Sequence, residues 1–431
     1  MKKYNLGIIG LGTVASGVIE SIRKNGALFS SRYGVEFDFV KIAVRNINAS
    51  RLVEVDSSIL TTNPEDVVNH PDVDVVLELM GGEEPARTFV LQALNNGKPV
   101  VTANKALIAE FGPELFAAAE ANGTRIFFEA SVAGGIPIIK ALNEGLSANS
   151  FESIHGILNG TCNYILSRME DGVTFEKALA EAQELGYAEA DPTLDVDGFD
   201  AGHKAAILAS LAFGQWFSKE NVSVSGIRDL DLADMAFAKE AGYKIKLLAN
   251  IKKTEDDRIS IDVQPTLVPD ESMIGAVSDV YNGIKIKGNV VGETFFYGQG
   301  AGKDATSSAV VADIIDASLC MSQDTMKEFS GFIPFEGASG PADLSEVNCR
   351  FYLRVVVDDC PKVLAQITGI LGDNGISIAS ITQKEQDEKS VPVVILTHEV
   401  LTSQMDEAME AIGKLDVVRE IPLRFRIEDI N

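Results

Sequence analysis

The segment YNLGIIGLGTVA, residues 4–15, decides the fold of the first third of the chain. Residues 4–9 are an apolar run that predicts a β-strand, and a glycine-rich turn follows directly. In that turn Gly10 permits a tight bend, Gly12 lets the backbone approach a pyrophosphate, and the small Ala15 lets a helix pack close to the strand. The helix predicted over residues 13–23 would present free N–H groups to phosphates. A plain tight turn is the alternative, but the position behind a first strand favours dinucleotide binding. The cofactor contacts predicted from this turn are Gly10, Gly12, Thr13 and Val14.

Strands and helices alternate through the rest of this region. Further strands are predicted over residues 36–44, 73–80 and 99–102, and helices over residues 85–95 and 104–121. Strands separated by helices of this length predict an α/β fold with a Rossmann-type, doubly wound parallel sheet.

The end of the second predicted strand bears on the choice of cofactor. A protein that prefers NAD places Asp or Glu there to hold the ribose hydroxyls, whereas this chain has Val44-Arg45-Asn46. The guanidinium of Arg45 suits a 2′-phosphate in charge and in geometry, so the sequence favours NADP over NAD. A solvated arginine at a strand end is the alternative.

The remaining two thirds predict two further folds. From about residue 135, helices (136–147, 175–185, 201–213, 305–317) mix with strands (243–251, 259–264), which indicates an α+β domain. A stretch rich in Gly, Pro and Ser predicts a linker over residues 331–349. The tail reads as strand 351–357, helix 361–373, strands 377–383 and 391–397, helix 403–414 and strand 423–427. This βαββαβ order is typical of the ferredoxin-like fold.

These patterns give four expected segments. They are a nucleotide-binding domain (1–134, to which the chain returns at about 303–330), a catalytic and dimerisation domain (135–302), a linker (331–349) and a C-terminal domain (350–431).

The composition excludes several classes of partner. The 431 residues carry a formal net charge of −26, which argues against nucleic acid and against an anionic membrane. The four cysteines, Cys162, Cys320, Cys349 and Cys360, have no metal-ligand spacing. Because no signal peptide and no uninterrupted apolar run of about 20 residues is recognised, we expect a cytoplasmic protein with reduced thiols.

The segment LGYAEADPTLDVDGFDAGHK, residues 185–204, holds five carboxylates and then a lysine. A calcium loop does not fit, because counting from Asp195 the glycine is fourth rather than sixth and the twelfth residue is Ala206. Asp200 is predicted to cap a helix, with Lys204 one turn later on the same face. A surface ion pair is the alternative, but the helix beyond Lys204 is apolar, which favours a partly buried lysine suited to proton transfer.

A second candidate lysine, Lys105, follows the fourth predicted strand in Thr102-Ala103-Asn104-Lys105. Ligands of open α/β sheets bind at the carboxyl ends of the strands, so this position favours a functional role over a solvated loop lysine.

The chain resembles the homoserine dehydrogenase family. The resemblance rests on the glycine-rich turn, on TANK (102–105), EASVAGGIP (129–137) and GILNGTCNYIL (156–166), on the acidic segment, and on GAG (300–302) before TSSAV (306–310). It implies NAD(P)-dependent interconversion of L-homoserine and L-aspartate 4-semialdehyde in threonine, methionine and isoleucine biosynthesis.

The resemblance also implies a role for particular residues. Lys204 matches the proton donor and Lys105 a second active-site lysine beside the nicotinamide. The implied substrate contacts are Glu189, Asp195 and Asp200. The further implied cofactor contacts are Thr102, Gly186 and Gly302. The implied monovalent cation site, with sodium expected and mostly backbone carbonyls as ligands, consists of Glu129, Val132, Gly134 and Ile136.

The tail resembles an ACT domain through VDDCPKVL (357–364) and ISI (376–378). Such domains bind amino acids, so threonine is the expected feedback effector. The family usually has glycine after the proline, where the ligand nears the backbone, whereas this chain has Lys362, and this puts threonine sensitivity in question. The resemblance implies a homodimer or homotetramer.

Two other functions fit parts of the sequence. An acylating semialdehyde dehydrogenase would need a nucleophilic cysteine, for which Cys162 is the candidate, although a small core residue is the other interpretation. A non-catalytic amino-acid sensor would explain the ACT-like tail, but it would have no use for the lysine pair Lys105 and Lys204.

Overall fold

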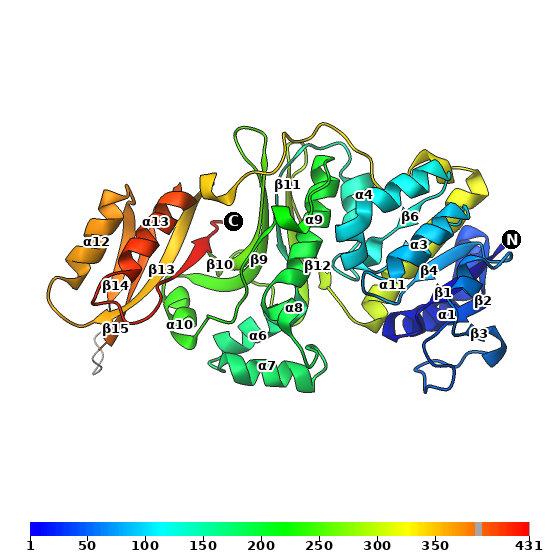
Figure 1. The fold of residues 1–431 in the computed structure, drawn as a ribbon, viewed down its shortest axis with the longest axis horizontal. Coiled ribbons are helices and arrows are strands. Elements are labelled where there is room, and N and C mark those ends of the chain that lie inside the picture. Colours follow the sequence, from blue (N-terminus) through cyan, green and yellow to red (C-terminus); the bar gives the residue numbers. More distant parts are fainter. Residues whose placement is uncertain (384–389, 431) are drawn as a thin grey trace. The chain divides into compact units, whose positions relative to one another are not determined.

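The computed structural model describes residues 1–383 and 390–430, so residues 384–389 and 431 of the predicted C-terminal domain lie outside the described part. The chain divides into two compact units (Figure 1). The first consists of Met1–Phe151, His203–Asn221 and Lys287–Ala338. The second consists of Glu152–Gly202, Val222–Ile286 and Ser339–Asn431. The four predicted segments divide the chain more finely than these units do.

The first unit contains the predicted doubly wound sheet. Its strands are β1 (Lys2–Ile9), β2 (Val35–Ala43), β3 (Leu60–Thr61), β4 (Val75–Glu78), β5 (Val100–Thr102) and β6 (Ile126–Phe127). Their order is β3-β2-β1-β4-β5-β6, and each neighbouring pair is parallel. The fold prediction for this region is therefore confirmed. The two-residue strands β3 and β6 were not predicted, because so short a segment has no readable periodicity.

Helices cover both faces of this sheet. They are α1 (Thr13–Tyr33), α2 (Glu65–Val68), α3 (Ala86–Asn95), α4 (Lys105–Ala121) and α11 (Lys303–Gln323). Helices α1 and α11 pack closely, since a Cβ at Gly17 would lie 2.9 Å from the carbonyl oxygen of Lys303. On the opposite face, a Cβ at Gly7 would lie 2.7 Å from Val67 of α2. Helix α1 extends ten residues past the predicted end at residue 23 and ends at Gly34, whose φ of 72° is left-handed.

Helix α11 is long and apolar enough to cross a membrane by length and composition alone. Half of its most apolar window is buried inside the protein, and Val310, Ile314 and Ala317 belong to the core that also contains α1 and strands of the sheet. This burial is that of a core helix.

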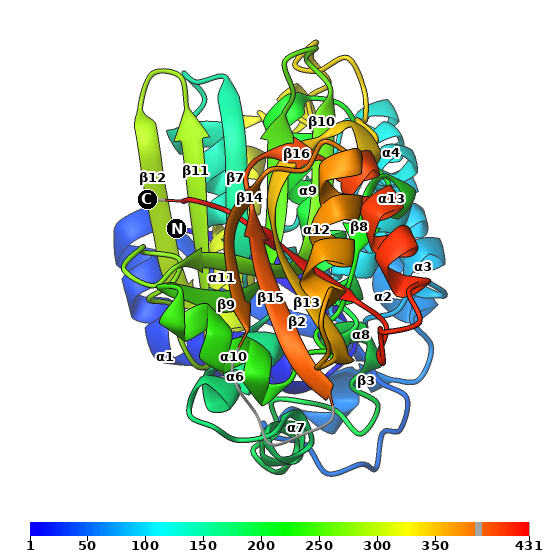
Figure 2. The ribbon, with the colours of Figure 1, turned by 90° about the vertical axis from the view of Figure 1, so that its left-hand side faces the viewer.

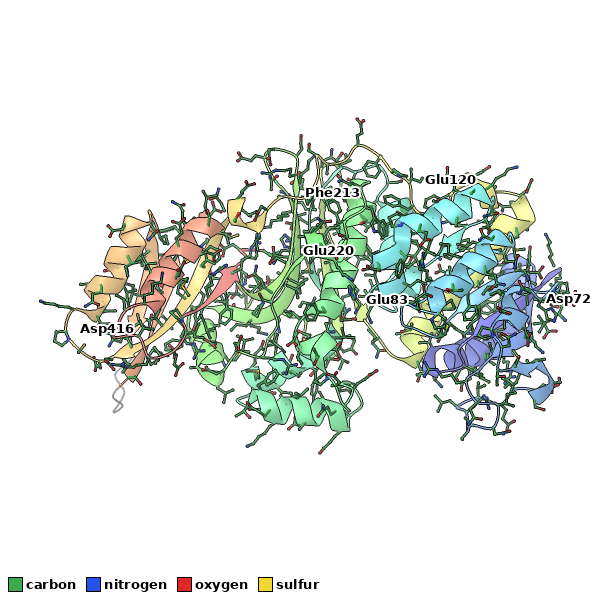
Figure 3. All side chains as sticks on the ribbon, viewed as in Figure 1. Asp72, Glu83, Glu120, Phe213, Glu220 and Asp416 are labelled. Atoms are coloured by element: carbon green, nitrogen blue, oxygen red, sulfur yellow. The ribbon has the colours of Figure 1, made fainter. Side chains whose placement is uncertain are left out.

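Two predicted helices of this region differ from the structure. Instead of one helix over residues 136–147 there is a short α5 (Ile138–Lys140), with Pro137 as its N-cap residue, and a π-helical turn (Ala141–Gly145). Helix α9 (Phe199–Phe213) begins two residues before the predicted start at 201 and ends at Phe213, labelled in Figure 3. The remaining strand is β12 (Gly292–Gln299).

The second unit is built on a long mixed sheet. Its strands are β7 (Phe151–Ile157), β8 (Ser223–Val224), β9 (Tyr243–Lys253), β10 (Ile259–Pro269), β11 (Tyr281–Gly288), β13 (Asn348–Asp358), β14 (Ile378–Gln383), β15 (Ser390–Thr397), β16 (Val400–Leu401) and β17 (Leu423–Ile427). Strand order runs β11-β7-β9-β10-β17-β13-β15-β14. Because β13 starts at Asn348, the predicted linker ends before residue 348.

The helices of this unit are α6 (Gly160–Glu170), α7 (Phe175–Glu184), α8 (Thr193–Val196), α10 (Leu232–Glu240), α12 (Val363–Asp373) and α13 (Thr402–Gly413). In the tail, β17-β13-β15-β14 with α12 and α13 form the predicted ferredoxin-like fold, which can be followed in Figure 2. Val363, Ile367 and Leu371 of α12 are buried in one core with residues of α13, so the predicted apolar face is confirmed.

A buried group of charges lies where the tail's sheet joins the rest of this unit. Strand β17 pairs in parallel with β10, and the fully buried Arg426 donates to Asp262 at 2.6 Å. Asp262 also accepts from Asn250 at 2.9 Å, and Asn250 contacts the ring of His155 at 3.2 Å. Burial lowers the pKa of His155 to about 4, so this imidazole stays neutral in the folded protein near neutral pH.

The buried His155 predicts an acid-sensitive stability. An unfolded chain protonates this ring below its ordinary pKa of about 6.5, whereas the folded chain resists protonation until about pH 4. His155 should therefore make its full contribution to the free energy of unfolding above pH 6.5. This contribution, up to about 3 kcal/mol, should be lost as the pH falls toward 4. Urea unfolding of the wild type and of His155→Gln across this range measures the difference. Equal slopes against pH for the two proteins would contradict the assignment.

Candidate functional site

The glycine-rich turn has the geometry that a bound dinucleotide needs. Gly10 has a φ of 94°, and a Cβ there would lie 2.7 Å from the carbonyl oxygen of Leu79 at the end of β4. A Cβ at Gly12 would meet no atom within 4 Å, so the space in front of the N-terminus of α1 is open. Gly10 thus allows the ends of β1 and β4 to lie close together, and Gly12 leaves room for a phosphate group.

A cavity of about 430 Å³ extends from this turn along the end of β2. Arg45 lines it and is exposed, and the loop that follows is folded around a second arginine, Arg51. The Arg51 guanidinium donates to the carbonyl oxygens of Asn46 at 2.8 Å, Ile47 at 2.9 Å and Ala49 at 2.7 Å. None of the residues that line this cavity is an Asp or a Glu. Arg51 was not predicted from the sequence, because an arginine in a polar loop looks the same there as a solvated one.

The ends of β4 and β5 are joined by a buried glutamate that sequence analysis also missed. Glu78 accepts from the Thr102 hydroxyl at 2.7 Å and from the backbone N–H groups of Met80 and Gly81. Its burial raises its pKa. Asn104 caps α4 through Leu107 and donates to the carbonyl oxygen of Gly82 at 2.7 Å.

Lys105 is the first residue of α4 and half-buried, so this network fixes its starting point at the carboxyl edge of the sheet. The predicted contacts Gly186 and Gly302 both have left-handed φ values, 75° after α7 and 110° before α11. Neither has another atom within 4 Å of an added Cβ. Both glycines are therefore compatible with close approach of a ligand.

The predicted cation segment turns sharply, with positive φ at Ala133 and Gly134. The carboxylate of Glu129 is occupied by backbone donors, accepting from the N–H groups of Ile139 at 2.9 Å and Lys140 at 2.8 Å. Burial, and then the charge of Asp313, raises the pKa of Glu129 to about 7. Within residues 1–383 and 390–430 no cluster of three or more His, Cys, Asp or Glu side chains could hold a metal. An ion at this segment would thus depend on backbone carbonyls.

The five carboxylates of the acidic segment differ in their hydrogen-bond and ion-pair partners. Asp191 accepts from the N–H of Thr193, the first residue of α8, and Asp197 forms an ion pair with Arg228. Glu189 is exposed.

Asp195 and Asp200 share one amide, which comes from a residue that sequence analysis did not select. The side-chain nitrogen of Asn159 donates to Asp195 at 2.7 Å and to Asp200 at 2.8 Å. Helix α9 begins at Phe199, so Asp200 lies in its first turn and not at the predicted cap position. Lys204 follows one turn later and is buried, 9% exposed. The buried lysine agrees with the prediction that it is not a surface group.

Cys162 does not have the surroundings of a nucleophile. Its side chain is fully buried, and its thiol donates to the carbonyl oxygen of Asp195 at 3.1 Å. The thiol therefore serves the packing of the acidic segment, and the acylating alternative lacks its reactive group.

The two glycines of the turn predict contrasting effects of the same substitution. Gly10→Ala should destabilise the protein by about 2 kcal/mol or more, because both the left-handed φ and the contact with Leu79 oppose a Cβ. Gly12→Ala should fold with an almost unchanged melting temperature but bind the dinucleotide about tenfold or more weakly, because the methyl group enters the phosphate space. Thermal melting and fluorescence titration with NADPH measure the two effects. Normal NADPH binding by a folded Gly12→Ala variant would contradict this position for the phosphates.

Comparisons with known proteins agree with this arrangement. Residues 137–315 match the family model described as homoserine dehydrogenase, residues 10–129 its NAD binding domain, and residues 351–417 the ACT domain. A homoserine dehydrogenase from Pseudomonas aeruginosa is 43% identical over 100% of both chains. The crystal structure of one from Thiobacillus denitrificans has a TM-score of 0.94 and 44% identity, covering 100% of this chain and 99% of that one. A hyperthermophilic archaeal homoserine dehydrogenase in complex with NADPH has a TM-score of 0.63 and 30% identity, covering 74% of this chain and 98% of that one. With full-length matches at this identity, the chain belongs to the homoserine dehydrogenase family.

Proposed function

We propose that this NAD(P)-dependent homoserine dehydrogenase binds its substrate through Glu189, Asp195 and Asp200 and moves the proton through Lys204. The observation that carries the proposal is the pair of carboxylates that share the amide of Asn159 on the segment leading into a buried lysine. Homoserine is a zwitterion, so its ammonium group needs carboxylates and its carboxylate needs a cation. A site with Asp195, Asp200 and two lysines supplies both kinds of charge.

The proposed roles follow from the reaction. Oxidation of a primary alcohol removes a hydride and a proton, and the nicotinamide accepts the hydride when the cofactor is bound. Lys204, buried and one helical turn from Asp200, takes the hydroxyl proton in this direction and returns it in the other. Lys105, at the start of α4 and at the carboxyl edge of the sheet, lies beside the nicotinamide in this proposal, with Thr102 as a further cofactor contact.

The cavity at the end of β2 supports NADP as the preferred cofactor. Arg45 and Arg51 line it, without any Asp or Glu among the lining residues. A 2′-phosphate carries negative charge and matches guanidinium donors, whereas a carboxylate would favour the free ribose hydroxyls of NAD. The archaeal relative solved with NADPH agrees with this choice.

The monovalent cation is proposed at the turn that contains Ala133 and Gly134. Since the Glu129 carboxylate already accepts two backbone N–H groups, the ligands proposed are backbone carbonyl oxygens. The residues that supply these carbonyls are Glu129, Val132, Gly134 and Ile136.

The ACT domain supports an amino-acid effector, for which threonine is proposed. Lys362 stands where a ligand would approach the backbone, and it has a left-handed φ of 80° directly before α12. A side chain in this conformation fills space that a glycine would leave open. We propose that wild-type sensitivity to threonine is weak for this reason.

Three further proposals concern domain boundaries, assembly and location. The proposed domain boundaries are those of the sequence (1–134 with a return at about 303–330, 135–302, 331–349 and 350–431), except that the linker ends before β13 begins at residue 348. A homodimer or homotetramer is proposed, in the cytoplasm, where the four free cysteines would stay reduced.

Homoserine-dependent reduction of NADP and NAD tests the reaction and the proton carrier. The wild type should turn over with a higher kcat/KM for NADP than for NAD. Lys204→Met should lose about 100-fold or more in kcat, because the proton carrier is gone while the volume is kept. Lys414→Met, which removes a lysine that is 71% exposed, is the matched control and should keep wild-type activity. Turnover by Lys204→Met at the wild-type rate would refute the role of this lysine.

Threonine titration of the same assay tests the proposed effector. Lys362→Gly should be inhibited at lower threonine concentrations than the wild type, and it should gain about 1 kcal/mol of stability from relief of the left-handed backbone. Lys362→Ala removes the long side chain but keeps a Cβ, so it separates the effect of backbone freedom from that of charge. Identical threonine inhibition of all three proteins would show that Lys362 does not control the effector.

A further inference from the structure

Asn159 is the N-cap of α6, and both ends of its side chain are occupied. The oxygen accepts from the N–H of Cys162 at 2.8 Å, and the nitrogen donates one bond to Asp195 and another to Asp200. The residue is 5% exposed. The cap fixes the orientation of the amide, since rotating it would direct an oxygen at two carboxylates and an N–H₂ group at a backbone N–H. The nitrogen must therefore face the acidic pair.

The chemical character of this donor matters. Two carboxylates held close together repel each other, and each seeks hydrogen-bond donors when it is buried. An arginine or lysine would satisfy them by neutralising their charge, as Arg228 does for Asp197. The Asn159 amide supplies two donors and no charge, so it fixes the positions of Asp195 and Asp200 without cancelling their attraction for a cation.

We propose that Asn159 is the positioning residue for substrate binding: it holds Asp195 and Asp200 oriented toward the ammonium group of homoserine. The inference rests on the proposed substrate-binding role of these two carboxylates. Asn159 itself acts only through them.

The neighbouring contacts separate this role from simple support of the chain. Thr161 donates its hydroxyl to the carbonyl oxygen of Tyr187 at 2.7 Å, and the Cys162 thiol donates to the carbonyl oxygen of Asp195. Both bonds dock the backbone of the acidic segment on the start of α6. Of the three docking side chains, Asn159 is the one that reaches carboxylate oxygens, so a Thr161 variant can report the effect of weaker docking alone.

Two substitutions keep the cap and remove the donors. Asp and Ser are both good N-caps, so Asn159→Asp and Asn159→Ser should retain α6. Asn159→Asp keeps the shape of the amide but places a third carboxylate against the first two. Thr161→Val keeps the shape of threonine and loses only the bond to Tyr187, which makes it the matched control.

The experiment measures kcat and KM for homoserine between pH 6 and 10, KM for NADP and the melting temperature, on the full chain. Asn159→Ser should raise KM for homoserine about tenfold at every pH, because two bonds to charged groups are lost. Asn159→Asp should raise it further at high pH and recover as the pH falls, because a proton bound to the three clustered carboxyls restores a donor. In both variants KM for NADP should stay within about twofold of wild type. Thr161→Val should lower the melting temperature but keep KM for homoserine within about twofold.

The outcomes are distinguishable. Wild-type turnover combined with an unchanged KM for homoserine in folded Asn159→Asp would overturn the inference alone. Equal increases in KM for Asn159→Ser and Thr161→Val, without pH dependence in Asn159→Asp, would reduce Asn159 to a structural cap and also overturn it. Absence of homoserine turnover by the wild type would overturn the proposed function and the inference together.

Discussion

A carboxylate that is taken out of water must be held by hydrogen-bond donors, and this constraint determines how the candidate active site is built. Glu78 is held by the N–H groups of Met80 and Gly81 and by the hydroxyl of Thr102. Asp195 and Asp200 share the amide of Asn159. Thr102 lies on β5 and Asn159 at the start of α6, so these two donors also fix one strand end or helix start against another.

Two buried carboxylates elsewhere in the second unit pair with arginines. Asp262 faces the buried Arg426, and Asp234 of α10 contacts Arg354 at 3.0 Å. These pairs join β17 to β10 and α10 to β13, where no ligand is proposed. Removing one partner of such a pair leaves an uncompensated buried charge, which is strongly destabilising. These two arginine pairs therefore hold the fold, whereas the amide of Asn159 positions carboxylates for which a substrate-binding role is proposed.

Much of the fold could be predicted from the sequence because its signals are local. The glycine-rich turn, the alternating strands and helices and the βαββαβ tail each depend on periodicity within one segment. The misses were where the local pattern is short or ambiguous: the two-residue β3 and β6, the last ten residues of α1, and the π-helical turn that follows α5.

The candidate site was less accessible to the sequence for a related reason. The acidic segment and both lysines could be selected from composition and spacing. Asn159 could not, because its partners lie 36 and 41 residues away, and an asparagine before a helix predicts only a cap. Arg51 was missed because its function is to order a loop through three backbone carbonyls, which has no sequence periodicity.

The overall charge gives one more constraint on the site. At −26 the protein repels an anionic dinucleotide at long range, so attraction has to be local. The first turns of α1 and α4, the two helices that start at the carboxyl edge of the parallel sheet nearest the proposed cofactor contacts, contain no Asp or Glu. The first turn of α9 contains Asp200, which is proposed to serve the ammonium group of the substrate. A helix N-terminus carries a partial positive charge. At α1 and α4 no acidic residue offsets that charge, so both helix starts can attract phosphates. At α9 the acidic residue makes the helix start attractive to a cation. The distribution of carboxylates over the starts of α1, α4 and α9 therefore matches the two ligands of opposite charge that the reaction requires, whereas α11, which begins after the proposed cofactor contact Gly302, has Asp304 in its first turn.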